Sequence, residues 1–528
     1  MPDLRDDSSP AATHDAFGAI LGRGLDIVAT AIGVGCLLVL LKAHLTMLAY
    51  PGPQEINEPA TWHQTYLLSC GRNPFTAEEL PASTQFFGPL YSYVVLALKP
   101  LFGTGYVGHR FVNFLCIGAS LWLIGAAMRR RGASLGVILT SLSVLYWIVL
   151  DNIMVTARPD ALGWLLFLVG LLVPAACDYA LGASILGLVC AVLAFQCKAY
   201  FALAGSAVLL GVASLRSWRV ALALAVGYFG AIAGSVALLT HFFPMYFLEV
   251  FVMQRNMVVG NSNPETGWLH TVLLLERGWP FFALMAAGLL VWLKSAGAAR
   301  WRSWRAGEIS TAQFLRPASS TEVLAVVLLV HLAFVQSYMG FNGGASFTYH
   351  VQLLFPLLLV LSAAALRTGW LHRAALPVLA VFALTSLHLR WQPTDSTAYQ
   401  RICDLIRLEH GEVFALPAAT EPLELNTKRV YDDGFAAFVN YALVDGLPDR
   451  LATAHAIDRR CDEQRAEVAA KIAARAFGLV LTEEDHSQWC DLDLLKAHYD
   501  VVEQFDMPTY FGHGPVWVWR PKVDALKK

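Results

Sequence analysis

The sequence predicts an α-helical polytopic membrane protein with about eleven transmembrane helices and a small C-terminal α/β domain. Of its 528 residues, 56% are hydrophobic and only 15% are charged. One soluble core cannot bury that excess of apolar residues. Apolar runs of about 20 residues, long enough to cross a bilayer as a helix, recur up to about residue 390. We therefore expect a membrane domain over 1–390 and a separate domain over 391–528, whose composition is ordinary for a globular protein.

The first apolar segment follows a polar stretch of mixed charge and lacks the features of a cleavable signal, so we expect it to remain as a helix. Short polar loops separate it from the later segments. The expected spans are approximately 24–48, 110–128, 134–152, 160–177, 181–196, 199–215, 220–240, 276–294, 321–339, 350–366 and 372–388.

Lysine and arginine residues in the short loops predict the orientation, because cytoplasmic loops are enriched in them. Four basic loops fall on the same side when the predicted spans alternate. This places the N-terminus in the cytoplasm and residues 49–109 outside, as a first outer loop. The basic loops are 129–131, Arg216 with Arg219, the cluster from Lys294 to Arg305, and Arg367 with Arg373.

The apolar run 86–102 is short and contains two prolines and a lysine. Counting it as a span would move the basic loop 129–131 outside. We expect instead a helix lying at the outer interface, with Tyr91 and Tyr93 at headgroup level, and a similar segment at 242–255.

The C-terminal region alternates between helical and strand-like patterns, which indicates a small α/β domain on the outer side. Helices are expected at 399–408 and 463–475. Strands are expected at 412–416, 477–482, 501–505 and 516–519.

Two carboxylates, Glu55 and Glu58, follow the first span and lie a few residues outside the membrane. In most membrane proteins such residues are solvated parts of a loop. In an enzyme, a carboxylate within hydrogen-bond reach of an acceptor hydroxyl acts as the general base.

Two isolated cations stand at other outer turns. Arg158 precedes Asp160 at the mouth of an apolar helix, where it either binds phosphate or carboxylate or merely pins the helix end by pairing with Asp160 or Asp151. Lys198 lies alone in a short turn, either as a point charge for a phosphate or as a lysine that extends to the interface.

A glycine-rich turn at 343–350 ends in Tyr349 and His350. Glycines allow a ligand to approach the backbone closely. The alternative is an ordinary turn whose tyrosine and histidine anchor it at the interface.

These pieces, in this order, resemble the GT-C superfamily of glycosyltransferases. Within it, they resemble the bacterial branch related to dolichyl-phosphate-mannose protein mannosyltransferases and lipid A aminoarabinose transferases. The resemblance covers residues 20–390, and the C-terminal region matches only loosely. It is carried by Asn57-Glu58, Asn73-Pro74-Phe75, Gly88-Pro89-Leu90-Tyr91, Arg158-Pro159-Asp160-Ala161-Leu162 and Lys198.

The resemblance implies an inverting glycosyltransferase that moves a sugar from a polyprenyl-phosphate donor to an acceptor hydroxyl. The reaction is expected at the periplasmic face of a bacterial inner membrane, on a cell-envelope glycan, glycolipid or protein. Glu58 is the expected base, with Glu55 as its substitute. The sequence departs from the family at Asn57, which stands where the family often has the aspartate of an Asp-Glu pair. Arg158 and Lys198 are expected to hold the donor phosphate. The expected pocket residues are Asp160, Tyr349, His350 and Tyr91.

No cofactor is expected to be required. Some relatives use a divalent metal, but the sequence has no compact acidic cluster and no Cys/His zinc spacing. No basic tract suggests a nucleic-acid partner.

Two other classes of protein compete with the transferase. A secondary transporter buries charges at mid-membrane, whereas the predicted spans are almost wholly apolar there. A non-catalytic scaffold or ligand-binding protein does not require Glu58, Arg158 and Lys198 to converge. Convergence on one outer cavity therefore favours the enzyme.

Overall fold

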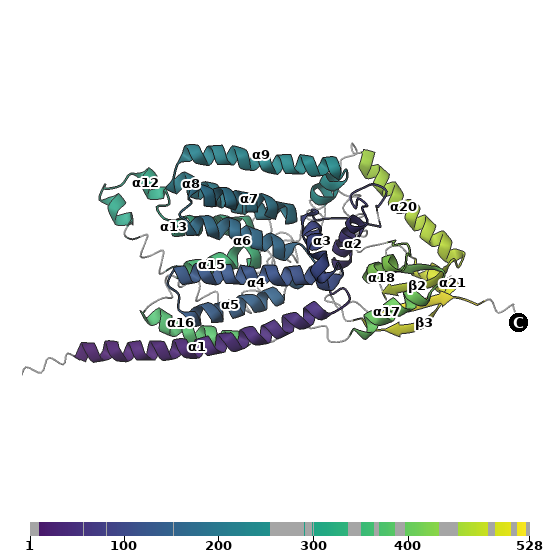
Figure 1. Ribbon diagram of the computed structural model, residues 1–528, viewed down its shortest axis with the longest axis horizontal. Helices are drawn as coiled ribbons and strands as arrows, with labels where there is room; N and C mark the ends of the chain where they lie inside the picture. Colours follow the sequence, from purple (N-terminus) through teal and green to yellow (C-terminus); the bar gives the residue numbers. More distant parts are fainter. Residues whose placement is uncertain are drawn as a thin grey trace, which may run out of the picture.

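A bundle of helices lies side by side, and a small β-sheet packs at one end of it (Figure 1). The computed structural model describes residues 10–55, 57–80, 82–151, 153–253, 300–335, 350–363, 369–385, 396–431, 452–483, 491–507 and 515–523, together with Leu290 and Ala298.

Each predicted span overlaps a helix except 276–294, of which only Leu290 is among the described residues. The helices are α1 (Pro10–Ala49), α4 (Tyr106–Arg130), α5 (Leu135–Leu150), α6 (Asp160–Ala176), α7 (Leu181–Cys197), α8 (Leu203–Leu215), α9 (Trp218–Phe242), α13 (Ser320–Phe334), α15 (Phe355–Ser362) and α16 (Gly369–Thr385).

Within the described part of the chain, three helical stretches are long and apolar enough to cross a membrane: Ile20–Ala49, Tyr106–Arg130 and Trp218–Phe242. The other apolar helices are shorter. The chain is thus a helical membrane protein, while the number of crossings stays a prediction.

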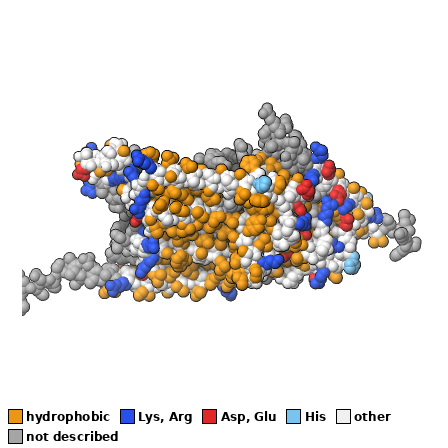
Figure 2. All heavy atoms as spheres, turned by 45° about the horizontal axis from the view of Figure 1, so that its top comes forward, with side chains coloured by type: hydrophobic (Ala, Val, Ile, Leu, Met, Phe, Trp, Pro, Cys, Tyr) orange, Lys and Arg blue, Asp and Glu red, His pale blue; other side chains and the backbone are white. Residues whose placement is uncertain are grey.

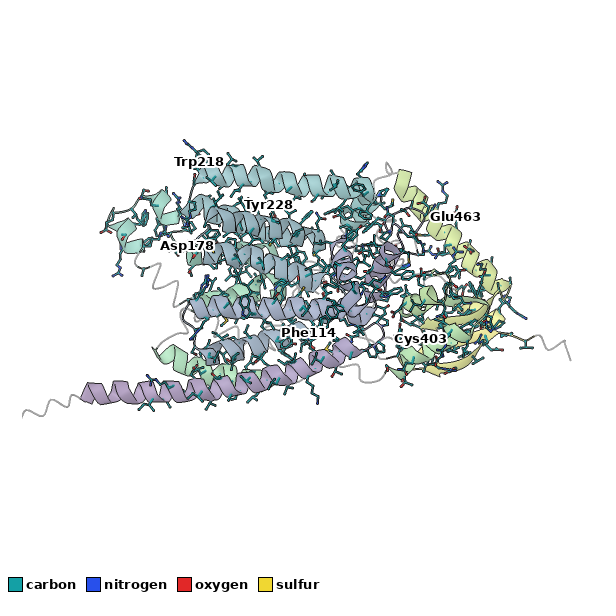
Figure 3. All side chains as sticks on the ribbon, in the orientation of Figure 1. Phe114, Asp178, Trp218, Tyr228, Cys403 and Glu463 are labelled. Atoms are coloured by element: carbon teal, nitrogen blue, oxygen red, sulfur yellow. The ribbon has the colours of Figure 1, made fainter. Side chains whose placement is uncertain are left out.

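The basic loops that the structure describes gather at one end of the bundle, as the alternation of spans predicts. Arg130 donates to the carbonyl of Ala176 at 3.4 Å, and Arg216 donates to that of Asp178 at 2.9 Å. Figure 2 shows a broad hydrophobic belt with Lys and Arg along one margin and charges of both signs beyond the other. In Figure 3, Asp178 and Trp218 mark the first end, and Cys403 and Glu463 mark the opposite end.

Two helices cover the end of the bundle nearest the sheet: α2 (Glu58–Ser69) and α3 (Leu90–Phe102). The expectation for Tyr91 is wrong: it is buried, and its hydroxyl donates to the carbonyl of His109 at 2.8 Å. Tyr93 stays 47% exposed. Tyr91 and Val95, which lie four positions apart and so share one side of α3, are both buried. The segment expected at 242–255 contains a π-helix, Leu248–Met253.

The C-terminal sheet has the order β1-β2-β4-β3. β1 (Glu412–Ala415) and β2 (Phe477–Glu483) are parallel; β3 (Tyr499–Phe505) and β4 (Val516–Pro521) complete it in antiparallel pairs. The accompanying helices are α17 (Thr397–Leu408), α18 (Thr420–Leu425), α20 (Ala452–Ala473) and α21 (Leu492–His498). All four predicted strands are found, and α20 begins earlier than expected.

The sheet region is fastened to the loop after α1 and to α2. The ring of Tyr399 packs on Gly52, where a Cβ atom would lie 2.5 Å from the Tyr399 Cγ atom. The Tyr399 hydroxyl in turn donates to Glu421 at 2.7 Å. Glu424 of α18 contacts the Nε2 atom of His63 in α2 at 2.9 Å. The C-terminal region therefore contacts the loop that carries Glu55 and Glu58, which is called the acidic loop below.

Candidate functional site

The candidate site lies where the loop after α1 meets the start of α6 and the end of α7, at the end of the bundle nearest the sheet (Figure 1). α4 contacts both the loop after α1 and the loop before α6. Its Arg110 donates to the carbonyl of Gly52. Three residues on, the side chain of Asn113 donates to the carbonyls of Thr156 and Arg158, the latter at 2.9 Å.

Glu58, the first residue of α2, is completely buried against α4. Both of its carboxylate oxygens accept hydrogen bonds from the Arg110 guanidinium, at 2.9 and 2.6 Å. The backbone N–H groups of Gln54 and Ala157 each donate to one of the same oxygens. A carboxylate has about four acceptor positions, so the four bonds fill those of Glu58.

Glu55 is also buried but has fewer donors. Its Oε1 atom accepts from Arg158 at 3.1 Å and from the side-chain amide of Asn57. Among the contacts of the described residues, its Oε2 atom accepts only from the backbone N–H of Asn57, at 3.0 Å. The Glu55 carboxylate therefore retains a position for one more donor, such as a hydroxyl group.

Arg158, Asp160 and Lys198 continue the chain of charges from Glu55. The Nε atom of Arg158 lies 3.3 Å from the Oδ2 atom of Asp160. The Lys198 ammonium donates to the Oδ1 atom of Asp160 at 2.7 Å. Asp160 lies in the first turn of α6, where the helix dipole favours a negative charge. Lys198 follows the last residue of α7 with an extended backbone.

An aromatic ring and an amide complete the surroundings. The ring of Phe87 lies 5.2 Å from the Arg158 guanidinium carbon and 5.3 Å from the Lys198 nitrogen. Gln352 donates to the Oδ1 atom of Asp160 at 3.2 Å and accepts from the hydroxyl of Tyr200. Both cations thus lie within cation–π distance of one aromatic ring, which stabilises positive charge away from water.

Burial shifts the pKa values of two side chains in the loops, Glu55 and Lys198. It raises the pKa of the Glu55 carboxyl, and the neighbouring Glu58 carboxylate adds to this shift while Arg158 opposes it. Burial lowers the pKa of the Lys198 ammonium, and Asp160 opposes that shift. Raised basicity in a buried carboxylate suits a general base.

The structure brings Glu55, Arg158, Asp160 and Lys198 into one chain of contacts, with Glu58 adjacent through Ala157. Tyr91 lies apart, facing His109. Tyr349 lies outside the described residues. His350 begins a π-helix, His350–Leu354, and nothing of its side chain is described.

Sequence reasoning missed Arg110, Gln352 and Phe87. Arg110 begins a predicted span, where a buried arginine needs a partner; that isolated charge was the available signal. Gln352 and Phe87 lie within apolar runs that show no comparable sign.

Among the described residues, no three His, Cys, Asp or Glu side chains lie close enough to hold a metal ion. The prediction that no metal is required stays a prediction.

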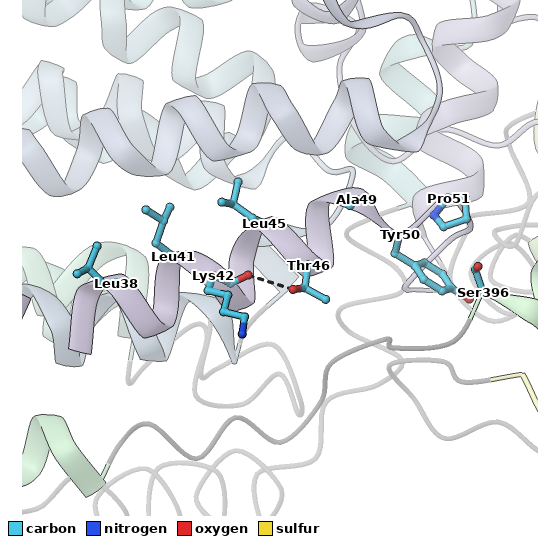
Figure 4. Close-up of a pocket in the computed structure, with 9 residues that line it drawn as sticks. All are labelled: Leu38, Leu41, Lys42, Leu45, Thr46, Ala49, Tyr50, Pro51 and Ser396. Atoms are coloured by element: carbon cyan, nitrogen blue, oxygen red, sulfur yellow. Dashed lines mark hydrogen bonds between the residues drawn. The ribbon is translucent and has the colours of Figure 1, made fainter. Parts of the chain in front are cut away.

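A hollow of about 610 Å³ runs along the outer part of α1 (Figure 4). Leucines line much of it, with Lys42 and Thr46 among them, and it ends at Tyr50, Pro51 and Ser396. It is separate from the charged residues of the candidate site.

No family model and no curated protein matches the chain. Among solved structures, the chain is similar to ArnT from Cupriavidus metallidurans bound to undecaprenyl phosphate. The sequences are 13% identical, the match covers 94% of this chain and 98% of ArnT, and the TM-score is 0.46. It is also similar to the Archaeoglobus fulgidus oligosaccharyltransferase tethered to an acceptor peptide. That match has 12% identity, covers 91% of this chain and 74% of the other, and has a TM-score of 0.43. Both proteins are members of the GT-C superfamily.

Proposed function

We propose that this chain is an inverting glycosyltransferase that moves a sugar from a polyprenyl-phosphate donor to an acceptor hydroxyl. The observation that carries the proposal is the continuous run of contacts from Glu55 through Arg158 and Asp160 to Lys198. It sets a carboxylate with an open acceptor position beside two cations, at one end of a membrane bundle. This is the set of groups that displacement of a phosphate by a hydroxyl requires.

Glu55 is the base in this proposal. Its open position accepts the proton of the acceptor hydroxyl while the acceptor oxygen forms a bond to the anomeric carbon. The bond from that carbon to the phosphate oxygen breaks, and its electron pair leaves with the polyprenyl phosphate. The configuration at the anomeric carbon is inverted, because the acceptor oxygen and the leaving phosphate oxygen occupy opposite sides of that carbon.

Arg158 and Lys198 stabilise the charge that develops on the leaving oxygen. Arg158 presents a planar fork of donors and Lys198 a compact point charge, and both suit phosphate. Asp160 and Phe87 keep the two cations in place before the donor binds. With Arg110 and the three carboxylates included, the formal charges of the group cancel. A bound phosphate then meets cations that are already fixed in position.

Glu58 has a positioning role. All four acceptor positions of Glu58 are filled, so it cannot accept the proton of a substrate hydroxyl. Its hydrogen bonds to Arg110 and Ala157 connect α2 to α4 and to the loop before α6. It is thereby the anchor that holds Glu55 three residues away.

The same proposal places the site at the periplasmic face of a bacterial inner membrane. Residues 1–390 form the membrane domain with a cytoplasmic N-terminus, and 391–528 form the periplasmic domain. The basic loops at the opposite end of the bundle support this orientation. Partners are the lipid-linked sugar, the bilayer, and a cell-envelope glycan, glycolipid or protein.

A scaffold or ligand-binding protein remains the competing function. A scaffold does not use the Glu55 carboxylate as a base and needs no open acceptor position on it. Removal of the Glu55 charge therefore distinguishes the enzyme from the scaffold.

The test uses purified wild type, Glu55→Gln, Glu58→Gln and the control Glu308→Gln, an exposed residue at the other end of the bundle. Release of polyprenyl phosphate is measured from a panel of lipid-linked sugars, with membrane extract as acceptor. We expect Glu55→Gln to lower turnover by about 10²–10⁴-fold without loss of fold, which is the usual contribution of a general base. Glu58→Gln should instead lower the unfolding temperature.

Full turnover by a folded Glu55→Gln variant would remove Glu55 from the mechanism. Absence of turnover by the wild type with every donor in the panel would favour the scaffold.

A further inference from the structure

A second hollow, of about 490 Å³, lies between α2 and the C-terminal region, away from the charged residues of the candidate site. We call it the α2 cleft. From the membrane domain it is lined by α2 and the segment 72–82, and from the C-terminal region by residues 424–430 and Gln464. Its polar lining includes His63, Tyr66, Arg72, Glu79, Glu424 and Lys428, together with Glu78, Thr427, Arg429 and Gln464.

Most charged groups that line the α2 cleft are already paired with one another, with the backbone or, for Arg429, with Glu467. Arg72 donates to both oxygens of Glu79, at 2.7 and 2.8 Å. Glu424 lies 2.9 Å from His63. The Lys428 ammonium donates to the carbonyl of Gly411 at 2.8 Å. These contacts fix donors and acceptors side by side on the wall of the cleft.

Such a lining disfavours an anionic ligand and a peptide. A phosphate or carboxylate would have to displace Glu79 from Arg72. A peptide is normally held by apolar anchors or by pairing with an exposed strand, and the lining is mostly polar with no strand in it.

Hydroxyl-rich ligands fit better. Each hydroxyl both donates and accepts, so one hydroxyl can bridge Arg72 and Glu79 without separating them. Tyr66 adds an aromatic surface: its ring stacks on that of Trp62 at 5.1 Å and 16°, which holds it rigid. A fixed ring of this kind packs on the apolar face of a sugar while polar groups bind its edges.

The α2 cleft is separated from Glu55 and Glu58 by α2 itself. Tyr66 follows Glu58 by eight residues, which is about 12 Å along a helix at 1.5 Å per residue. At about 100° per residue, the His63 side chain is rotated about 140° from that of Glu58 around the axis of α2, and the Tyr66 side chain about 80°. A sugar in the cleft is therefore not the reacting one.

We infer that the α2 cleft binds the glycan part of the acceptor, at a distance from the hydroxyl that reacts. The inference rests on the proposed transferase function and narrows its acceptor to a molecule with an oligosaccharide portion.

The test measures binding without donor, so that it is independent of turnover. The full chain, purified in detergent, is titrated with mannotetraose, chitotetraose and a lipopolysaccharide core oligosaccharide, followed by tryptophan fluorescence and calorimetry. A serine- and threonine-containing peptide and tripolyphosphate are titrated in parallel. Variants are Tyr66→Ala, Arg72→Ala and the exposed control Arg302→Ala from the other end of the bundle.

We expect saturable binding of at least one oligosaccharide, weakened at least tenfold by Tyr66→Ala and by Arg72→Ala and unchanged by Arg302→Ala. Thermal unfolding of each variant checks its fold, and Tyr66→Phe, which keeps the ring, should retain binding.

Three results would overturn the inference: no oligosaccharide binding, oligosaccharide binding that neither cleft variant weakens, or peptide binding that both cleft variants abolish. Cleft binding together with full turnover by Glu55→Gln would count against the proposed mechanism alone. Loss of turnover in Glu55→Gln without any glycan binding would count against the cleft alone.

Discussion

Glu55 and Glu58 are three residues apart in one short loop, yet their surroundings differ in kind. Glu58 has a bidentate arginine and two backbone donors. Glu55 has one contact from an arginine that also serves Asp160, and two from Asn57. The difference shows that burial and a cationic partner do not identify a base, because both residues have them. In the proposed mechanism, the number of acceptor positions left open separates Glu58, the anchor, from Glu55, the base.

The largest expected effect tests the anchor. Arg110→Met leaves the buried Glu58 carboxylate without its cation, and breaking such a pair costs about 3–5 kcal/mol. We expect most of the protein to fail to fold, as measured by thermal unfolding in detergent and by yield.

The matched control is the double variant Glu58→Leu with Arg110→Met, which removes both charges and should recover much of the stability. Equal instability of the single and double variants would mean that the pair does not act as an anchor.

The next effect concerns the chain of charges. Arg158 contacts Glu55 through Nη1 and Asp160 through Nε, and a lysine cannot span both. We expect Arg158→Lys to lower kcat by about 10²-fold, the size seen when one group that stabilises developing charge is removed. Steady-state kinetics on donor and acceptor measure it, with Arg130→Lys at the opposite end as control. A variant with wild-type kcat would remove Arg158 from the leaving-group site.

The pH profile sharpens the assignment of the base. Glu55 must be deprotonated to act, and burial raises its pKa above the ordinary value of 4.5. Activity should therefore fall as pH decreases at a higher pH than for an exposed glutamate. Lys198 must be protonated, and burial lowers its pKa, so the basic limb should fall below the ordinary range for lysine. An acidic limb unchanged in Lys198→Arg but shifted in Glu55→Asp would support this pairing of limbs and residues.

The smallest effect tests whether the C-terminal region supports the loop. Gly52→Ala places a Cβ atom 2.5 Å from the Tyr399 ring, and overpacking of this kind costs about 1–3 kcal/mol. We expect a lower unfolding temperature and a modest loss of turnover. Gly118→Ala, whose Cβ would meet no atom within 4 Å, is the control. Equal behaviour of the two variants would show that Tyr399 does not brace the loop.

Much of the fold could be predicted because its signals are local. A run of apolar residues or an alternating strand pattern is complete within one segment, which is why β1 to β4 and most helices agree with expectation. α2 was missed because its sequence, EPATWHQTYLLS, has neither pattern; tertiary burial of its polar side chains holds it.

The candidate site was harder to predict from the sequence, because many of its contacts join residues that are far apart in the chain. Single charges at outer turns predicted Glu58, with Glu55 as its substitute, together with Arg158, Asp160 and Lys198. Arg110 is 52 residues from Glu58, and no local pattern predicts that pair. The order of preference between Glu58 and Glu55 depends on backbone donors from Gln54 and Ala157, which only the folded chain brings together.

The distances along the chain also set an order in time. Glu55 and Glu58 are synthesised well before their arginine partners, Arg158 and Arg110. Gln352, which donates to Asp160, follows that residue by 192 positions. In the proposed orientation, the carboxylates of the first outer loop cross the membrane during insertion before the cations that later neutralise them have been synthesised. A nascent chain that stops before residue 352 holds the acidic loop but not the finished cluster. In the proposed mechanism, the site is therefore complete only after most of the membrane bundle has been synthesised.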